Sequence, residues 1–143
     1  MTIEPDRTEL AEFSVSAEDM AAFRRLSGDT NPLHDDETFA RGRGFEGPVV
    51  YGALIVAQIS QLLGTRLPGP GCVWRSLSLR FRGPLYVGQH ARLAATIVHA
   101  NEDIGTVDLK LRVDAGGRCI ADGETAALLK AEPAARPPER VHA

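Results

Sequence analysis

The sequence predicts an α+β fold in which one long apolar helix packs against an antiparallel sheet. Two observations lead to this prediction. Over residues 51–65, apolar side chains cover nearly every direction around a helix, which is typical of a buried helix. From residue 73 onward, apolar and polar residues alternate with period two, which is typical of strands with one buried face. Such a helix must be wrapped by the sheet or covered by a second copy of the chain.

The elements before the long helix follow from local signals. Residues 8–15 predict a short strand. Ser16 predicts a helix N-cap and Gly28 the end of that helix, with Met20, Phe23 and Leu26 recurring at helical spacing between them. Residues 29–36 are rich in turn formers, and a short helix capped by Asp35 or Asp36 is expected to follow.

The second half of the chain predicts an antiparallel meander. Alternating runs begin at residues 73, 91 and 106, and a last strand is expected over residues 118–130 after a glycine hairpin at residues 115–117. Residues 1–131 are predicted to form a single domain. The Pro- and Ala-rich tail over residues 132–143 is expected to be disordered.

Composition excludes several classes of function. The 143 residues carry a formal net charge of −3, which argues against a nucleic-acid-binding surface. The two cysteines, Cys72 and Cys119, do not form a metal-binding pair, so no metal or other cofactor is expected. The N-terminus lacks the features of a signal peptide, and the apolar stretch is too short and polar to cross a bilayer. A soluble, cytoplasmic protein is expected.

Asp29 and His34 are the first candidates for chemistry. They lie five residues apart in a turn that glycine and proline make sharp, so a carboxylate and an imidazole could reach one water molecule there. Histidine titrates close to neutral pH, which suits proton transfer. Two simpler interpretations stay open from these residues alone. Asp29 could serve only as a turn residue or cap, and His34 could be an ordinary surface histidine.

The segment around this pair resembles a known family. Residues 23–34 read Phe-Arg-Arg-Leu-Ser-Gly-Asp-Thr-Asn-Pro-Leu-His, which is similar to the signature of the MaoC-like, (R)-specific enoyl-CoA hydratases. The resemblance extends over most of the chain. It includes Pro48 to Gly52 before the long helix, the segment 62–69 at its end, and residues 81–88.

The resemblance implies a hot-dog fold, in which a curved antiparallel sheet wraps a long central helix. It implies a hydro-lyase that reversibly converts trans-2-enoyl thioesters into (R)-3-hydroxyacyl thioesters of coenzyme A or an acyl carrier protein. It also implies a homodimer. Asp29 and His34 fall on the catalytic pair, the Gly52 amide on the oxyanion donor, and Ser60 on a residue that lines the site. Asn31 and Tyr51 are further candidates for substrate contacts, although Asn31 is better suited to holding the loop.

Other functions remain open. The main alternative is a 3-hydroxyacyl-carrier-protein dehydratase of a polyketide or fatty-acid pathway, which runs the same equilibrium in reverse, and a lesser one is a non-catalytic partner subunit. A hot-dog thioesterase is disfavoured because residues 51–65 contain no Asp or Glu. The sequence departs from the family pattern at Tyr51, Ala53 and Gln89. Several arginines could contact phosphates or serve only solubility: Arg41, Arg43, Arg66, Arg80 and Arg82.

Overall fold

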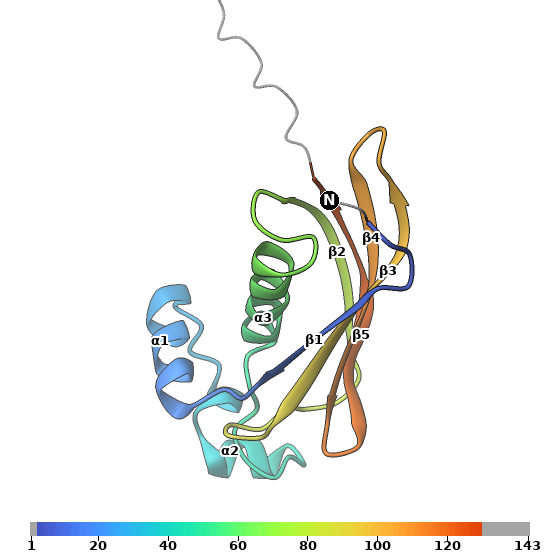
Figure 1. Ribbon diagram of the computed structural model, residues 1–143. Helices are drawn as coiled ribbons and strands as arrows, with labels where there is room; N and C mark the ends of the chain where they lie inside the picture. Colours follow the sequence, from blue (N-terminus) through green and yellow to red (C-terminus); the bar gives the residue numbers. More distant parts are fainter. Residues whose placement is uncertain (1–2, 130–143) are drawn as a thin grey trace, which may run out of the picture.

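The computed structural model describes residues 3–129 as an antiparallel sheet with helices on one of its faces (Figure 1). The predicted α+β class is confirmed. The elements in chain order are β1 (Thr8–Phe13), α1 (Ala17–Ser27), the 3-10 turn η1 (Pro32–His34), α2 (Glu37–Gly42), α3 (Gly52–Thr65), β2 (Val73–Phe81), β3 (Ala91–Asn101), β4 (Thr106–Ala115) and β5 (Arg118–Leu128).

The sheet has the strand order β1-β3-β4-β5-β2, so β1 and β2 are its edges. All of its pairings are antiparallel, as the alternating pattern predicts. The last strand ends at Leu128, two residues before the predicted end. The expected single domain over residues 1–131 stays a prediction, and the tail over residues 132–143 lies outside the described residues.

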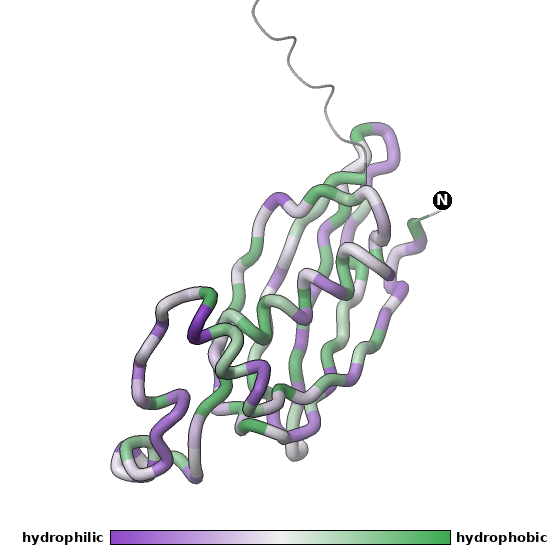
Figure 2. The backbone as a smooth tube through the Cα atoms, turned by 90° about the vertical axis from the view of Figure 1, so that its left-hand side faces the viewer, coloured by the Kyte–Doolittle hydropathy of each residue, from purple (hydrophilic) through white to green (hydrophobic). Residues whose placement is uncertain are grey.

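The hydrophobic core lies between α3 and the sheet. Figure 2, which views the molecule from the side of the helices, shows hydrophobic residues recurring between hydrophilic ones along the strands. From α3 the core receives Ile55, Ile59, Leu62 and Leu63, all nearly inaccessible to solvent. From the sheet it receives the inward-facing residues of β3 and β4, among them Leu93, Ile97, Leu109, Leu111 and Val113. Burial of this size is the main force holding the helix on the sheet.

One face of α3 remains exposed, although the sequence predicts burial all round. The exposed residues of the helix are Ala53, Ala57, Ser60, Gln61, Gly64 and Thr65. A single sheet covers only the side of a helix that faces it, so the opposite side of α3 meets solvent within one chain. No helix among residues 3–129 is long and apolar enough to cross a membrane.

Helix α1 begins and ends where the sequence predicts. Ser16 accepts a hydrogen bond from the Asp19 amide, while the Asp19 carboxylate accepts one from the Ser16 amide, which completes a capping box. Gly28 ends the helix with φ of 75°, a left-handed conformation that glycine adopts without strain. The apolar stripe on α1 is shorter than predicted, because Met20 is buried but Leu26 is 85% exposed.

Candidate active site

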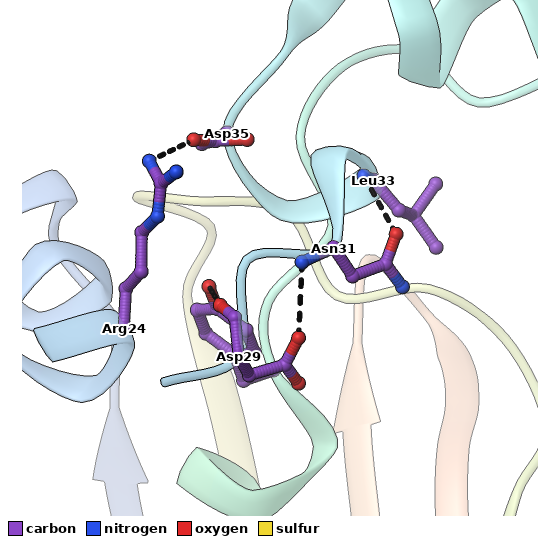
Figure 3. Close-up of polar contacts among 6 residues, drawn as sticks. Arg24, Asp29, Asn31, Leu33 and Asp35 are labelled. Carbon is purple, nitrogen blue, oxygen red and sulfur yellow. Dashed lines mark hydrogen bonds and ion pairs between the residues drawn. The ribbon is translucent and has the colours of Figure 1, made fainter. Parts of the chain in front are cut away.

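Asp29 and His34 lie in one loop between α1 and α2. Consecutive side-chain to main-chain hydrogen bonds give this loop its shape (Figure 3). The Asn31 amide donates to Oδ1 of Asp29 at 3.1 Å, and the Leu33 amide donates to Oδ1 of Asn31 at 3.1 Å. These are Asx-turns, which asparagine and aspartate favour because their short side chains mimic a main-chain turn. The loop therefore holds Asp29 in a defined position.

Asp29 is exposed and keeps one carboxylate oxygen available. Its Oδ1 is occupied by the Asn31 amide, whereas Oδ2 accepts no hydrogen bond from the described residues. Its own amide donates to the Ser27 hydroxyl at 3.1 Å, which anchors it to the end of α1. Asp29 thus forms the turn that its sequence context favours and still presents an acceptor to solvent.

His34 is half-buried and fixed at one ring nitrogen. Its Nδ1 lies 2.6 Å from the main-chain oxygen of Val49. A carbonyl oxygen can only accept, so Nδ1 must carry the hydrogen of this bond. In the neutral ring, Nε2 then holds the lone pair and can accept a proton. The Val49 amide in turn donates to the Leu33 oxygen at 3.1 Å, which ties the segment before α3 to the loop.

Tyr51 contacts both members of the pair. Its hydroxyl donates to the main-chain oxygen of Asp29 at 2.7 Å, and its ring stacks on the imidazole of His34 with centroids 4.0 Å apart. Only 3% of Tyr51 is exposed. Burial, followed by the charges of Asp29 and Asp35, raises the pKa of Tyr51 above its usual value of 10.0. The hydroxyl therefore remains a donor across the neutral range.

Gly52 opens α3 directly after Tyr51. The first amide groups of a helix have no acceptor within the helix, and here the N-cap Tyr51 makes no side-chain capping bond. The N-terminus of this 14-residue helix also carries a partial positive charge. The ring of Phe81 covers Gly52 so closely that a Cβ there would lie 2.9 Å from Cζ of Phe81. Sequence reasoning missed this role of Phe81, because the contact joins residues far apart in the chain.

The two other predicted site residues, Asn31 and Ser60, lie in different parts of the structure. Asn31 shapes the loop through its side-chain oxygen. Ser60 lies on the exposed face of α3, eight residues beyond Gly52, which corresponds to roughly 12 Å along a helix. No hydrogen bond among the described residues joins Ser60 to the Asp29 and His34 loop. Its expected contact with substrate stays a prediction.

An apolar cavity of about 270 Å³ adjoins the loop. Its walls include His34 and Tyr51, together with Met20, Pro48 and Val87. The ion pair between Arg24 of α1 and Asp35, drawn in Figure 3, also borders it. A wider hollow of about 630 Å³ lies on the sheet. It is lined by Arg80 and Arg82, two of the arginines considered for phosphate contacts, but by none of the residues predicted for the chemistry.

Some of the charged groups elsewhere form ion pairs with one another. Three of the arginines considered for phosphate contacts are engaged: Arg41 with Glu37, Arg82 with Asp122, and Arg66 with the Leu10 oxygen. Within residues 3–129, no group of three or more His, Cys, Asp or Glu side chains is placed to hold a metal ion.

Comparison with known proteins places this chain in a family. The model of the MaoC-like domain matches residues 2–115. The chain belongs to the MaoC-like family. This MaoC-like domain is 38% identical over 105 residues to an (R)-specific enoyl-CoA hydratase of Aeromonas caviae, covering 73% of this chain and 78% of that protein. It is 32% identical to a 3-hydroxybutyryl-CoA dehydratase of Methylorubrum extorquens, covering 85% and 78%.

Solved structures of similar proteins have the same fold. An (R)-hydratase from A. caviae involved in PHA biosynthesis superimposes on the MaoC-like domain with a TM-score of 0.85 and 34% identity, covering 90% of this chain and 98% of that one. The predicted hot-dog fold is therefore confirmed.

Proposed function

We propose that this MaoC-like domain reversibly hydrates trans-2-enoyl thioesters to (R)-3-hydroxyacyl thioesters. One observation carries the proposal. Tyr51, the residue before Gly52, contacts both Asp29 and His34, so the two residues proposed as the acid–base pair lie beside the N-terminus of α3. The activities named for the similar hydratase and dehydratase support it.

The site chemistry fits hydration of a double bond conjugated to a thioester. In the proposed reaction, Oδ2 of Asp29 orients a water molecule and Nε2 of His34 accepts its proton. The hydroxide oxygen bonds to C3, the C2–C3 π electrons move toward the thioester, and the imidazolium then returns the proton to C2. Negative charge develops on the thioester oxygen, where the Gly52 amide would donate a hydrogen bond. His34 is the proposed base because its Nδ1 donates a hydrogen bond to the Val49 oxygen, which leaves the lone pair of the neutral ring on Nε2.

The proposed substrate is an acyl-CoA or an acyl-carrier-protein thioester. The apolar lining of the cavity beside His34 suits an acyl chain better than a charged ligand. Asn31 and Ser60 remain proposed substrate contacts. Dehydration of a 3-hydroxyacyl thioester is the second candidate function, because it is the same equilibrium and one of the similar proteins is named for it.

The proposed assembly is a homodimer. Two exposed features of one chain support it. The small residues on the outer face of α3 would allow another helix to approach closely, and β2 is an unpaired sheet edge that carries Val73, 40% exposed, and Phe81, 55% exposed. An open strand edge with apolar side chains is a surface on which another chain can pair.

The experiment that tests this function measures turnover with two matched substrates. Purified protein is mixed with crotonyl-CoA or with crotonyl-acyl-carrier protein, and loss of the enoyl thioester absorbance is followed. The product is then analysed for its configuration at C3. We expect rapid loss with at least one carrier and formation of the (R)-3-hydroxy product. No turnover of either thioester, in either direction, would contradict the proposal and favour a non-catalytic subunit.

A further inference from the structure

We propose that Tyr51 is a positioning residue for the reaction, which fixes the main chain at Asp29 with its hydroxyl and the imidazole of His34 with its ring. This inference rests on the proposed function. It assigns Tyr51 a role separate from the substrate contact expected from sequence, because its polar atom is already used within the chain.

The hydroxyl contact is well placed for such a role. It reaches back 22 residues, from the N-cap of α3 to the main-chain oxygen of Asp29. The loop is otherwise held by its own Asx-turns, by the bond from the Asp29 amide to Ser27, and by the bonds that Leu33 and His34 make with Val49. Among the described residues, the Tyr51 bond is the one that joins the main-chain oxygen of Asp29 to the start of α3. Tyr51 itself is buried, which limits the access of water to the donor side of this bond.

The ring contact completes the arrangement. The imidazole of His34 lies on one aromatic neighbour, Tyr51, at an interplanar angle of 26°. Phe23 of α1 packs against the same tyrosine with centroids 4.7 Å apart. The Val49 oxygen fixes Nδ1 of His34, but one hydrogen bond leaves the ring free to tilt about it. Stacking on Tyr51 restricts that tilt and so sets the direction of Nε2.

Tyr51 is also covalently joined to Gly52. The Tyr51 side chain therefore contacts the residues of the proposed carboxylate and the proposed base, and the next peptide carries the proposed oxyanion donor. Geometry matters steeply here, because a displacement of about 1 Å can cost about a hundredfold in rate. A residue that acts only on this geometry is expected to change kcat while leaving KM unaltered.

Two substitutions separate the two contacts. Tyr51→Phe removes the hydroxyl and keeps the ring, whereas Tyr51→Leu removes both. The matched control is Tyr86→Phe, the other tyrosine of the chain, whose hydroxyl accepts from the Glu46 amide at 3.0 Å and touches neither Asp29 nor His34. We expect Tyr51→Phe to lower kcat about tenfold, the effect of one hydrogen bond, without changing KM. Tyr51→Leu should lower kcat further, and Tyr86→Phe should change neither constant.

An NMR measurement gives a readout that needs no turnover. The carbon-bound imidazole protons of His34, assigned with a His34→Gln variant, should lie upfield in the wild type because they stack on an aromatic ring. They should stay upfield in Tyr51→Phe and move downfield in Tyr51→Leu. These shifts test the ring contact even if neither thioester is turned over.

Either of two results would overturn the inference. One is a raised KM with unchanged kcat in Tyr51→Phe, which would make Tyr51 a substrate contact. The other is unchanged His34 resonances in Tyr51→Leu, which would show that the ring does not hold the imidazole.

Discussion

At the scale of single residues, Gly52 combines two requirements. The close approach of the Phe81 ring leaves no room for a Cβ unless that ring moves, and the proposed chemistry uses the Gly52 amide. The two requirements can be separated, because Gly52 is the first residue of α3. Proline is tolerated at this position of a helix and lacks an amide hydrogen. Tyr51, with φ of −55° and ψ of 127°, already has a conformation that a following proline accepts.

This arrangement gives a sharp prediction for the oxyanion donor. In a Phe81→Ala background, which makes room beside residue 52, we expect Gly52→Ala to keep its activity. We expect Gly52→Pro in the same background to lose about 10²- to 10³-fold in kcat, the usual effect of removing one oxyanion donor. Steady-state hydration rates and circular dichroism spectra of the two variants provide the comparison. Equal kcat values in two folded variants would exclude the Gly52 amide as the donor.

At the scale of elements, α1 positions the loop that carries Asp29 and His34. It supplies Phe23, which packs on Tyr51, and Arg24, which pairs with Asp35. The hydroxyl of its last residue, Ser27, accepts a hydrogen bond from the Asp29 amide. Its first turn depends on the capping box. Hydrogen bonds from the amide and then the hydroxyl of Ser16 lower the pKa of Asp19 below its usual value of 3.8. A carboxylate with a lowered pKa stabilises the folded state above its unfolded pKa, and this stabilisation is lost as pH falls.

We therefore expect acid sensitivity from this cap. Between pH 7 and values below 3.8, urea unfolding should show a larger loss of stability for the wild type than for Asp19→Asn. At pH 7, Ser16→Ala should lower the free energy of unfolding by about 1 kcal/mol, as expected for loss of an N-cap. If Asp19→Asn loses as much stability on acidification as the wild type, the capping carboxylate is not the source of the acid sensitivity.

Local sequence signals predict the helices and strands well, but they do not predict contacts between residues far apart in the chain. Ser16 and Gly28 mark both ends of α1 because capping depends on neighbouring residues. The loop of Asp29 was likewise predictable as a turn. The hydroxyl of Tyr51 and the ring of Phe81 were not, since each acts on a residue more than 20 positions away and no periodicity records such a contact. For the same reason the sequence indicates Tyr51 only as a candidate substrate contact, which stays a prediction, and its contacts with the loop are visible only in the structure.

At the scale of the whole molecule, the exposed face of α3 is the main departure from expectation. The sequence predicts a helix buried on all sides, and one sheet covers only part of it. The apolar pattern could not indicate whether the remaining cover comes from the same chain or from another one. Ser60 lies on that exposed face, so its proposed contact with substrate depends on what packs there.

The proposed homodimer gives a direct prediction for this face. Sedimentation equilibrium should give the wild type a mass twice that of one 15.4 kDa chain. Ala57→Arg, which places a long charged side chain in the middle of the exposed face, should give the mass of a single chain. Ala22→Arg, on the exposed side of α1, is the matched control and should remain a dimer. A monomeric wild type, or a dimeric Ala57→Arg, would show that α3 is not the interface.

The proposed acid–base pair is tested most directly by substituting Asp29 and His34 themselves. Asp29→Asn keeps an oxygen for the Asn31 amide, and His34→Gln keeps a donor for the Val49 oxygen, so both variants should fold. The controls are Asp108→Asn and His99→Gln, an exposed Asp and His that face each other between β3 and β4.

The deciding measurement is the hydration rate of whichever crotonyl thioester the wild type accepts. We expect each substitution at the pair to lower kcat by about 10²- to 10⁴-fold, the usual contribution of a general acid or base, and the controls to match the wild type. Wild-type rates in folded Asp29→Asn and His34→Gln would contradict the proposed role of the pair.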